Sequence, residues 1–387
     1  LPLRLGADNQ GGALFRGRLD EVRLYCRVLS REEIAARYAG REVNRSLTSA
    51  VDLSRYPVAC RDGKLLADYP ALVGHNDVVY LTPALYPFEA LPLGNGNLGV
   101  PLWNQDGMYY KFNNGSFWRF LGQVTAQRSS GEARLSDSPG FLEDATDFKQ
   151  RLSLYEGVVY TRATTPQGEV RVTSFVAQDQ DLLVVHVDDR RSGPVRRRLT
   201  LSHWVEDVRF TGEDGLIAVD SWSGSPDKPP ITGLPLPTTS VLAARVEGLP
   251  ATVEAQKDLT ISLDLGTGGP AEYTVYLAAP AVREEQGEPL AYARGMLEAA
   301  QRRGWEELLR ENKRFWADFW EKSALYLSGE DATAEYFAQL WYLNLYWAGC
   351  QSRGPYCPKF DGGQFVLEKD HRSWGGMYWY QNTRQLF

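Results

Sequence analysis

The sequence has 387 residues, of which 43% are hydrophobic and 24% are charged, and its formal net charge at pH 7 is −7. This composition is typical of a globular protein that is long enough for two or more domains. Its single basic run is Arg196-Arg197-Arg198, and no stretch approaches the roughly 20 apolar residues of a membrane span. The sequence therefore predicts no nucleic-acid partner and no membrane span.

The ends of the chain carry no leader pattern, because Leu1 is not a methionine and no charged segment precedes an apolar one. The chain also stops at Phe387 within a polar and aromatic run. We interpret the sequence as a fragment at both ends.

The cysteines form no C-x-x-C motif, so they indicate neither a zinc site nor a thioredoxin motif. The rest of the sequence shows no clear metal site, and no cofactor is predicted. The cysteines are Cys26, Cys60, Cys350 and Cys357. Cys350 and Cys357 either pair across a loop in an oxidising compartment or remain free buried thiols.

Residues 1–40 contain a strand-like alternation from Phe15 to Tyr25, followed by Ser30 as the N-cap of a short helix. The run F-x-G-x-L-D-E-V-R-L-Y-x-R-x-L-S-x-E-E-I resembles the closing end of a laminin-G-like, concanavalin-type jelly roll. Such domains often bind glycans. The resemblance covers only the last part of that domain.

Residues 75–285 are expected to form a long β domain, after a polar segment at 41–74 that is either a linker or the first strands of this domain. Strand patterns recur at short spacing between turn signals rich in glycine, which favours a sandwich. They are Val78–Leu81, Glu169–Phe175, Leu182–Val187, Leu199–Trp204 and Tyr273–Leu277.

The run Leu91–Gly99 contains the letters of a dinucleotide fingerprint, G-x-G-x-x-G. That motif requires a strand before it and a helix after it. Here the run Val100–Asn104 reads as a strand. The glycines are therefore predicted to permit a tight turn, in which the side chain of Asn95 lines a pocket.

Residues 288–323 have helical spacing of apolar residues, and Gly304 is expected to divide them into two helices. Residues 331–351 form another predicted helix, which ends before Gly354-Pro355. Its apolar residues cover almost the whole circumference, so we expect it to be buried on all sides. That pattern suits the inner layer of a helical barrel.

Residues 347–387 combine flat aromatic side chains with polar heads, as a sugar site requires, because a pyranose has an apolar face and a rim of hydroxyls. The stacking candidates are Trp374, Tyr378, Trp379 and Tyr380, and the polar candidates include Asp361 and His371. The alternative is a loop that caps a core with aromatic side chains.

The order of β-sandwich, linker helix and helical barrel resembles the six-hairpin (α/α)6-barrel glycoside hydrolases with an N-terminal β-supersandwich. The closest similarity is to the α-L-fucosidase and α-L-galactosidase type. Ala90–Gly99 looks like that family's A-L-P-L-G-N-G-x-L-G, and Phe315-Trp316-x-x-Phe319-Trp320-x-x-Ser323 looks like the end of its linker helix. Tyr378–Gln385 loosely resembles its N-x-N-x-Q stretch.

This resemblance implies an asparagine pair that orients the attacking water, and here only Asn382 matches. The second position is Tyr380 or Arg384, neither of which offers an amide carbonyl. The resemblance also implies an inverting reaction with a carboxylic acid that protonates the leaving oxygen. We expect that acid beyond Phe387, since Asp361 falls on no motif position.

The expected fold class is multidomain, β then α. Its parts are the tail of a β jelly roll (1–40), a linker (41–74), a β-supersandwich (75–285), linker helices (286–330) and the truncated start of an (α/α)6 barrel (331–387). The expected function is a secreted or periplasmic, exo-acting, inverting glycoside hydrolase of fucosidase or galactosidase type with a carbohydrate substrate. The alternatives are a carbohydrate-binding protein without activity, and a lyase or phosphorylase on a related barrel.

Overall fold

The computed structural model describes residues 34–35, 38–39, 57–61, 64–121, 124–204, 208–213, 216–222, 238–257, 259–327, 332–358 and 363–365. The chain divides into two compact units, Leu1–Asp68 and Tyr69–Phe387. In the first unit, β1 (Val58–Arg61) and β2 (Lys64–Ala67) form an antiparallel hairpin within the segment expected as a linker. All of the jelly-roll motif at 15–34 except Ile34 lies outside the described residues.

The second unit contains a sheet of ten strands among the described residues, and β19 pairs with β15 at the side of its path. In spatial order the other strands are β13 (Arg209–Glu213), β14 (Leu216–Trp222), β15 (Thr238–Glu247), β18 (Ala271–Ala278), β11 (Leu182–Asp189), β10 (Gly168–Val176), β9 (Val158–Thr165), β8 (Asp147–Ser153) and β3 (Val78–Tyr80). The strand β19 is Ala281–Arg283.

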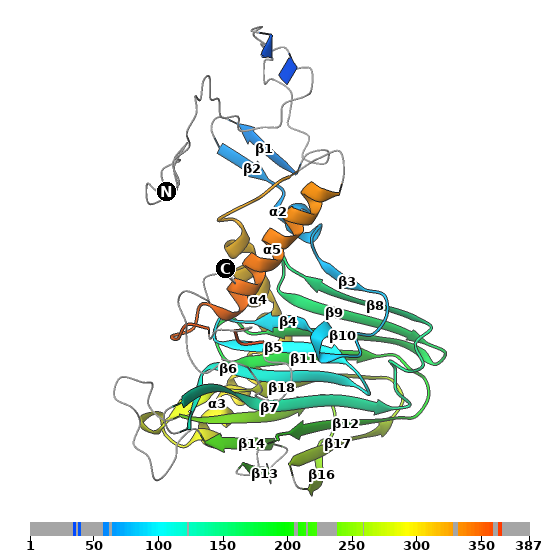
Figure 1. Cartoon of the computed structure of the whole chain (residues 1–387). Coiled ribbons are helices and arrows are strands. Elements are labelled where there is room, and N and C mark those ends of the chain that lie inside the picture. The colour runs from blue at the N-terminus through cyan, green and yellow to red at the C-terminus, as the bar shows by residue number, and fades with distance from the viewer. Residues whose placement is uncertain are drawn as a thin grey trace. The chain divides into compact units, whose positions relative to one another are not determined.

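A second sheet of seven described strands lies against the first (Figure 1). In spatial order its strands are β16 (Thr252–Lys257), β17 (Thr260–Gly268), β12 (Val195–Ser202), β7 (Val124–Ser138), β6 (Met108–Leu121), β5 (Leu98–Asn104) and β4 (Leu91–Gly94). All pairings in both sheets are antiparallel, which agrees with the predicted sandwich.

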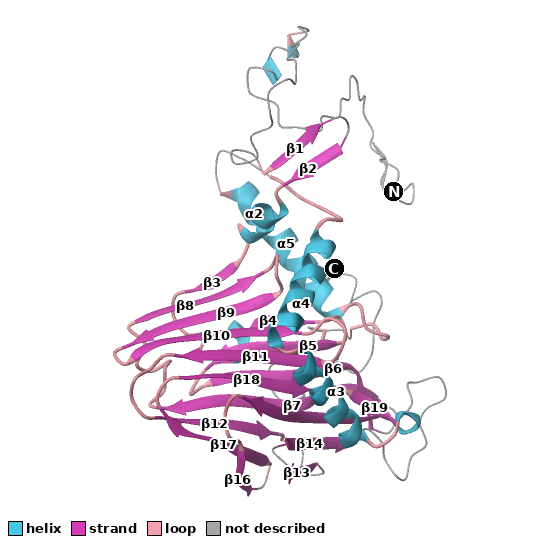
Figure 2. Ribbon diagram, turned by 180° about the vertical axis from the view of Figure 1, so that it is seen from behind, coloured by secondary structure: helices cyan, strands magenta, loops and turns pink. Residues whose placement is uncertain are grey.

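The central strand β11 has apolar residues on both of its faces, because both faces are covered. Leu182 and Val184 belong to a core cluster that also contains Ala293 and Leu297 of α3 (Pro289–Arg303). Leu183 and Val185 are buried as well, and alternate residues of a strand point to opposite faces. Figure 2 shows α3 lying across the outer face of the ten-stranded sheet.

The helical segment that follows the sheets is divided at Gly304, as predicted. Gly304 has a φ of 78° and separates α3 from α4 (Trp305–Trp320). The side chain of Glu288 accepts a hydrogen bond from Ala291 N at the start of α3, and Pro289 occupies the first helical position. Two shorter 3₁₀ turns are η1 (Pro87–Glu89) and η2 (Glu284–Gln286).

A short helix at the start of the second unit, α2 (Tyr69–Gly74), packs against α4. The hydroxyl of Tyr69 donates to the carbonyl oxygen of Glu321 at 3.1 Å. Residues 69–74 therefore belong to the second unit, although the sequence placed them in a connection.

The last described helix, α5 (Thr333–Gln351), corrects one prediction. It was expected to be buried on all sides, but Tyr336 is 56% exposed and Phe337 is 57% exposed. The buried stripe runs through Ala338, Tyr342 and Tyr346 at a spacing of four residues, which is one face of a helix. This face contacts β4 and β5. The described residues therefore cover only part of the apolar surface of this helix.

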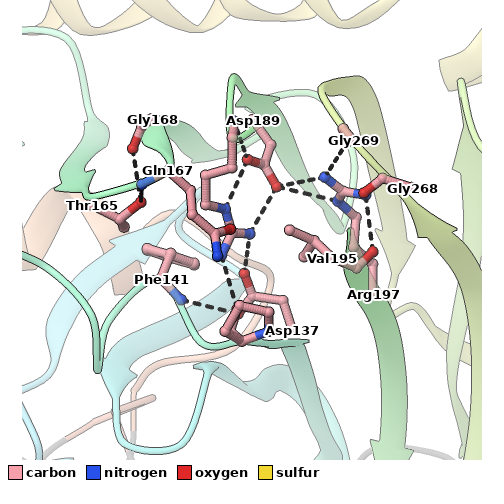
Figure 3. A network of polar contacts seen from close by, with 12 residues as sticks. Asp137, Phe141, Thr165, Gln167, Gly168, Asp189, Val195, Arg197, Gly268 and Gly269 are labelled. Carbon is pink, nitrogen blue, oxygen red and sulfur yellow. Dashed lines mark hydrogen bonds and ion pairs between the residues drawn. The ribbon is translucent and has the colours of Figure 1, made fainter. Parts of the chain in front are cut away.

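A buried ion-pair cluster joins the two sheets where the interior strand β11 ends (Figure 3). The carboxylate of Asp189 on β11 accepts hydrogen bonds at 2.7 Å from both Arg191 and Arg197, and Arg197 lies on β12 of the other sheet. Arg191 also pairs with Asp137 on β7. The adjoining cavity measures only about 10 Å³, which is room for one water at most. The cluster is therefore structural rather than a ligand site.

Candidate functional site

The run Leu91–Gly99 forms an antiparallel hairpin of β4 and β5 with its turn at Asn95–Asn97. A strand follows the glycines, so the structure excludes the dinucleotide fingerprint, as the sequence predicted. Gly96 has a φ of 94°, a conformation that glycine adopts at no steric cost.

The glycines of this hairpin permit a close approach by the end of α5. Gly96 N donates to the carbonyl oxygen of Cys350 at 2.8 Å, and Gly96 O accepts from the backbone of Gly354 at 2.8 Å. A Cβ at Gly94 would collide with the carbonyl oxygen of Cys350, and one at Gly99 would lie 2.9 Å from Cβ of Gln364. The glycine motif is therefore a docking surface for the residues at and after the end of α5.

The asparagines of the same hairpin hold one carboxylate. Asp181, in the loop between β10 and β11, accepts hydrogen bonds from the side-chain amides of Asn97 (2.7 Å), Asn114 (2.8 Å) and Asn95 (3.2 Å). Asn114 lies on β6 and also donates to the carbonyl oxygen of Ala279 at 2.8 Å. Segments that are far apart in the sequence thus meet at Asp181, and we name the three asparagine side chains around it the asparagine cage.

The electrostatic setting of Asp181 is unusual for an acid because amide groups, not cations, surround it. Burial raises the pKa of its carboxyl, while the hydrogen bonds from the cage lower it. Among the described residues no cationic side chain forms an ion pair with Asp181. A carboxyl group with a perturbed pKa that lines a cavity is a candidate for a functional residue.

Asp181 and two asparagines of the cage, Asn95 and Asn97, form one wall of an open cavity of about 560 Å³. Its other walls come from the loop at 178–181, from β19 and η2, from the start of α3 and from residues 353–356 after α5. The lining combines amide side chains such as Gln178 and Gln286 with the aromatic rings of Tyr292 and Tyr356. Its volume lies within the ~300–1,000 Å³ typical of small-molecule sites.

Arg353 stands on the rim beside the hairpin turn and is fixed by contacts from several elements. Its guanidinium lies 4.1 Å from the ring centroid of Phe315 on α4. Its Nε donates to the carbonyl oxygen of Gly349 at 2.8 Å, and Nη2 donates to the side-chain oxygen of Gln178 at 2.6 Å. Gln178 in turn donates to Asn312 of α4 at 2.9 Å. The cavity rim is thus tied to both α4 and α5.

Among the residues predicted from the sequence, Asn95 lines the cavity, as expected for a residue of the hairpin turn. Its hydrogen-bonding groups are already engaged within the protein. Its Oδ1 accepts from the backbone of Asn97 (3.0 Å) and Leu98 (2.7 Å), and its Nδ2 faces Asp181 and two carbonyl oxygens. Its direct contact with a substrate stays a prediction.

The other predicted site residues lie outside the described part of the chain. They are Asn382, Asp361, His371, Trp374, Tyr378, Trp379 and Tyr380. Sequence reasoning missed Asp181 and Arg353. The only available signal was the polar run Gln178–Asp181 between two apolar strands, which is equally typical of an ordinary turn.

Further observations concern metals, thiols and membranes. No cluster of three or more His, Cys, Asp or Glu side chains suitable for a metal occurs within the described residues. Cys350 is buried and Cys357 is exposed, and both are free. In the part of the chain with described structure, every helix is too short or too polar to cross a membrane.

Comparison with known proteins identifies a family model described as a domain of unknown function (DUF5703), which matches residues 79–232. No curated protein matches the sequence. A solved structure of a protein assigned as a kojibiose phosphorylase from the human microbiome is similar over 70% of this chain and 41% of that chain, with 14% identity and a TM-score of 0.50. This chain therefore spans less than half of that protein's length.

Two further solved structures are similar to this chain with lower TM-scores. The inverting mannosidase of glycoside hydrolase family 92 from Bacteroides thetaiotaomicron VPI-5482 gives 11% identity and a TM-score of 0.39 over 72% of this chain and 38% of that one. A bacterial glucoamylase complexed with acarbose gives 8% identity and a TM-score of 0.38 over 80% and 50%. At 14% identity the likeness to the protein assigned as a kojibiose phosphorylase shows the fold alone, which in this chain is a β domain followed by helices.

Proposed function

We propose that this chain is part of a carbohydrate-active enzyme that acts on oligosaccharides. The observation that carries the proposal is the open cavity of about 560 Å³ beside the asparagine cage. Its amide side chains suit the hydroxyl rim of a sugar, and the rings of Tyr292 and Tyr356 suit an apolar sugar face. The fold likeness to the protein assigned as a kojibiose phosphorylase supports the same class of substrate.

The reaction proposed first is hydrolysis with inversion, of fucosidase or galactosidase type, from the sequence motifs that resemble such hydrolases. In this scheme Asn382 orients the attacking water, while a carboxylic acid protonates the leaving oxygen. The sugar specificity and a secreted or periplasmic location rest on the same resemblance.

A phosphorylase is the second candidate, and the fold likeness is the observation that favours it. In that reaction inorganic phosphate replaces water as the nucleophile, so the product is a sugar phosphate. The two candidates therefore differ in their requirement for phosphate.

The experiment uses the complete gene product that carries this chain, with a panel of fucosylated, galactosylated and glucosylated oligosaccharides, each with and without inorganic phosphate. Released products are followed by NMR. Release of a free sugar with inverted anomeric configuration, independent of phosphate, supports the hydrolase. Release of a sugar phosphate only in the presence of phosphate supports the phosphorylase. Binding of these oligosaccharides without turnover of any of them would support the alternative of a carbohydrate-binding protein without activity.

The role of Asn382 is tested by Asn382→Ala, with Asn344→Ala on the exposed side of α5 as the matched control. Removing a water-positioning amide is expected to lower kcat by about a hundredfold or more, while the control keeps the wild-type rate. Equal rates for the two variants would remove Asn382 from the mechanism.

A further inference from the structure

We infer that Asp181 and Arg353 are the two polar anchors of the cavity, and that together they select an uncharged sugar residue. One ligand hydroxyl donates to Asp181 Oδ1, and another ligand oxygen accepts from Arg353 Nη1. This inference rests on the proposed function, because it assigns the sugar to this cavity.

The acceptor capacity of Asp181 points to a ligand donor. An ionised carboxylate has about four acceptor positions on its two oxygens. Oδ2 accepts from Asn97 and Asn114, whereas within the described part of the chain Oδ1 accepts only from Asn95, and that bond is the longest of the three at 3.2 Å. Asp181 is partly exposed to the cavity. One acceptor position on Oδ1 therefore remains for a hydroxyl group.

The orientation of the cage excludes a cation as the natural occupant. Asn95 Oδ1 accepts from two backbone N–H groups, and Asn114 Oδ1 accepts from Ser116 N at 2.8 Å. These bonds fix the amides with their NH₂ groups toward Asp181. A metal ion needs oxygen ligands at that position, so the cage holds a carboxylate in place for a hydrogen-bond donor.

The guanidinium of Arg353 supplies the complementary donor. Its Nε and Nη2 have the acceptors described above, whereas Nη1 has no protein acceptor among the described residues. No carboxylate of the described chain forms an ion pair with Arg353. The stacking on Phe315 holds the group at the rim, so Nη1 is available to a ligand oxygen.

The charge balance of the cavity favours a neutral ligand. Four charged side chains line it, and two of them are paired within the protein: Asp179 with Arg303 at 2.8 Å and Arg283 with Glu285 at 3.4 Å. The two that remain, Asp181 and Arg353, have opposite signs. A carboxylate or phosphate on the ligand would meet Asp181 in a poorly solvated position, where like charges repel strongly.

Asp179 and Arg283 therefore serve as matched controls, because they line the same cavity but have partners of their own. Binding to the complete gene product is measured by calorimetry with methyl galactoside, methyl α-L-fucoside and methyl galacturonide. The galactoside and galacturonide differ only at C6, as a hydroxymethyl against a carboxylate. Thermal unfolding of each variant confirms that it is folded.

We expect the wild type to bind a neutral glycoside at least about tenfold more tightly than the galacturonide. Asp181→Asn and Arg353→Met should each weaken neutral binding by about 10- to 100-fold, the effect of losing a hydrogen bond to a charged group. Asp179→Asn and Arg283→Met should change it less than about threefold, as expected for exposed ion pairs. Asp181→Asn should also reduce the discrimination against the galacturonide.

Asp181→Asn places an amide against the amides of the cage and is the variant most at risk of misfolding. Arg353→Met replaces the guanidinium that stacks on Phe315 with an unbranched apolar side chain and tests the other anchor independently. The inference is overturned if a folded Arg353→Met variant binds as the wild type does, if the galacturonide binds as tightly as the galactoside, or if no neutral glycoside binds. Turnover with affinities unchanged by both variants would overturn this inference alone. If the affinities of the variants change as expected but no substrate is turned over, only the proposed enzymatic function is overturned.

Discussion

The backbone N–H of Gly96 donates to the carbonyl oxygen of Cys350 at 2.8 Å, so the turn between β4 and β5 is joined directly to the last turn of α5. That carbonyl belongs to the helix end, where no intrahelical donor remains for it. The hairpin therefore caps the helix and fixes the direction in which the chain leaves it. Arg353, three residues later, is placed at the cavity rim by this contact.

Gly96→Ala is expected to destabilise the second unit by two separate effects. The residue has a φ of 94°, and an added Cβ would collide with Cβ of Arg353. The backbone conformation costs about 1–2 kcal/mol for a residue other than glycine, and the collision adds about 1–3 kcal/mol as overpacking. Chemical denaturation measures the sum.

Gly287→Ala is the control for this substitution, because Gly287 has a φ of 98° and open space around it. It should show the backbone effect alone. If both variants lose the same free energy of unfolding, the close approach of α5 to the hairpin contributes nothing.

Two fully buried tryptophans on α4 should respond differently to replacement by phenylalanine. Trp320 Nε1 donates to the carbonyl oxygen of Leu154 at 2.8 Å, whereas Trp316 Nε1 has no acceptor among the described residues. Both changes remove a similar ring volume, but Trp320→Phe also leaves a buried carbonyl unpaired. We expect Trp320→Phe to cost about 1–3 kcal/mol more than Trp316→Phe, as measured by urea unfolding. A larger loss for Trp316→Phe would contradict this account.

Asp77 should make stability depend on pH in a defined window. Burial raises the pKa of its carboxyl from 3.8 to about 6, against the opposing effects of Leu154 N–H and Arg151. Because the folded pKa lies above the ordinary value, folding favours the protonated acid. The contribution of Asp77 protonation to the free energy of unfolding is fully present below pH 3.8 and is lost as the pH rises through about 6.

The substitution Asp77→Asn tests this window. The variant should be about 1–3 kcal/mol more stable than the wild type at pH 7.5, with little difference at pH 3.8. Its amide oxygen can still accept from Leu154 N, as the Asp77 carboxylate does at 2.8 Å. Asp106→Asn, at a side chain 55% exposed, is the control and should change stability by less than about 1 kcal/mol. A constant difference between Asp77→Asn and wild type across pH 4–7 would refute the assignment.

Arg197→Met should destabilise the sandwich strongly, because it leaves Asp189 with fewer partners in a buried position. Burial opposes ionisation of Asp189, yet hydrogen bonds from Arg191 and Arg197 outweigh it and lower the pKa. Removing one partner of a buried ion pair costs about 3–5 kcal/mol. The loss should be seen in thermal unfolding at neutral pH.

The pH dependence of this variant has the opposite sign to that of Asp77. A lowered pKa contributes stability that is present above pH 3.8 and is lost as the pH falls through the folded value. The difference between wild type and Arg197→Met should therefore narrow below pH 3.8. Arg209→Met removes an arginine whose side chain is 79% exposed and should change stability by less than about 1 kcal/mol.

Local pattern in the sequence was sufficient for several of the elements. The alternation in Glu169–Phe175 corresponds to β10, the apolar run Leu182–Val187 corresponds to β11, and Gly304 separates two helices. Rejection of the dinucleotide motif and the pocket-lining position of Asn95 also followed from the sequence. These properties depend on neighbours a few residues away, where strand and helix periodicity act.

Only the tertiary structure decided which residues meet. Asn95 and Asp181 are 86 positions apart, and their contact depends on the antiparallel registers that bring β6, the hairpin and the loop before β11 to one place. The composition of α5 gave no sign that Tyr336 and Phe337 would be exposed. Periodicity reports which face of an element is apolar, but burial depends on what covers that face. For the same reason the anchors Asp181 and Arg353 emerged from the packing of α5 on the hairpin and not from any motif.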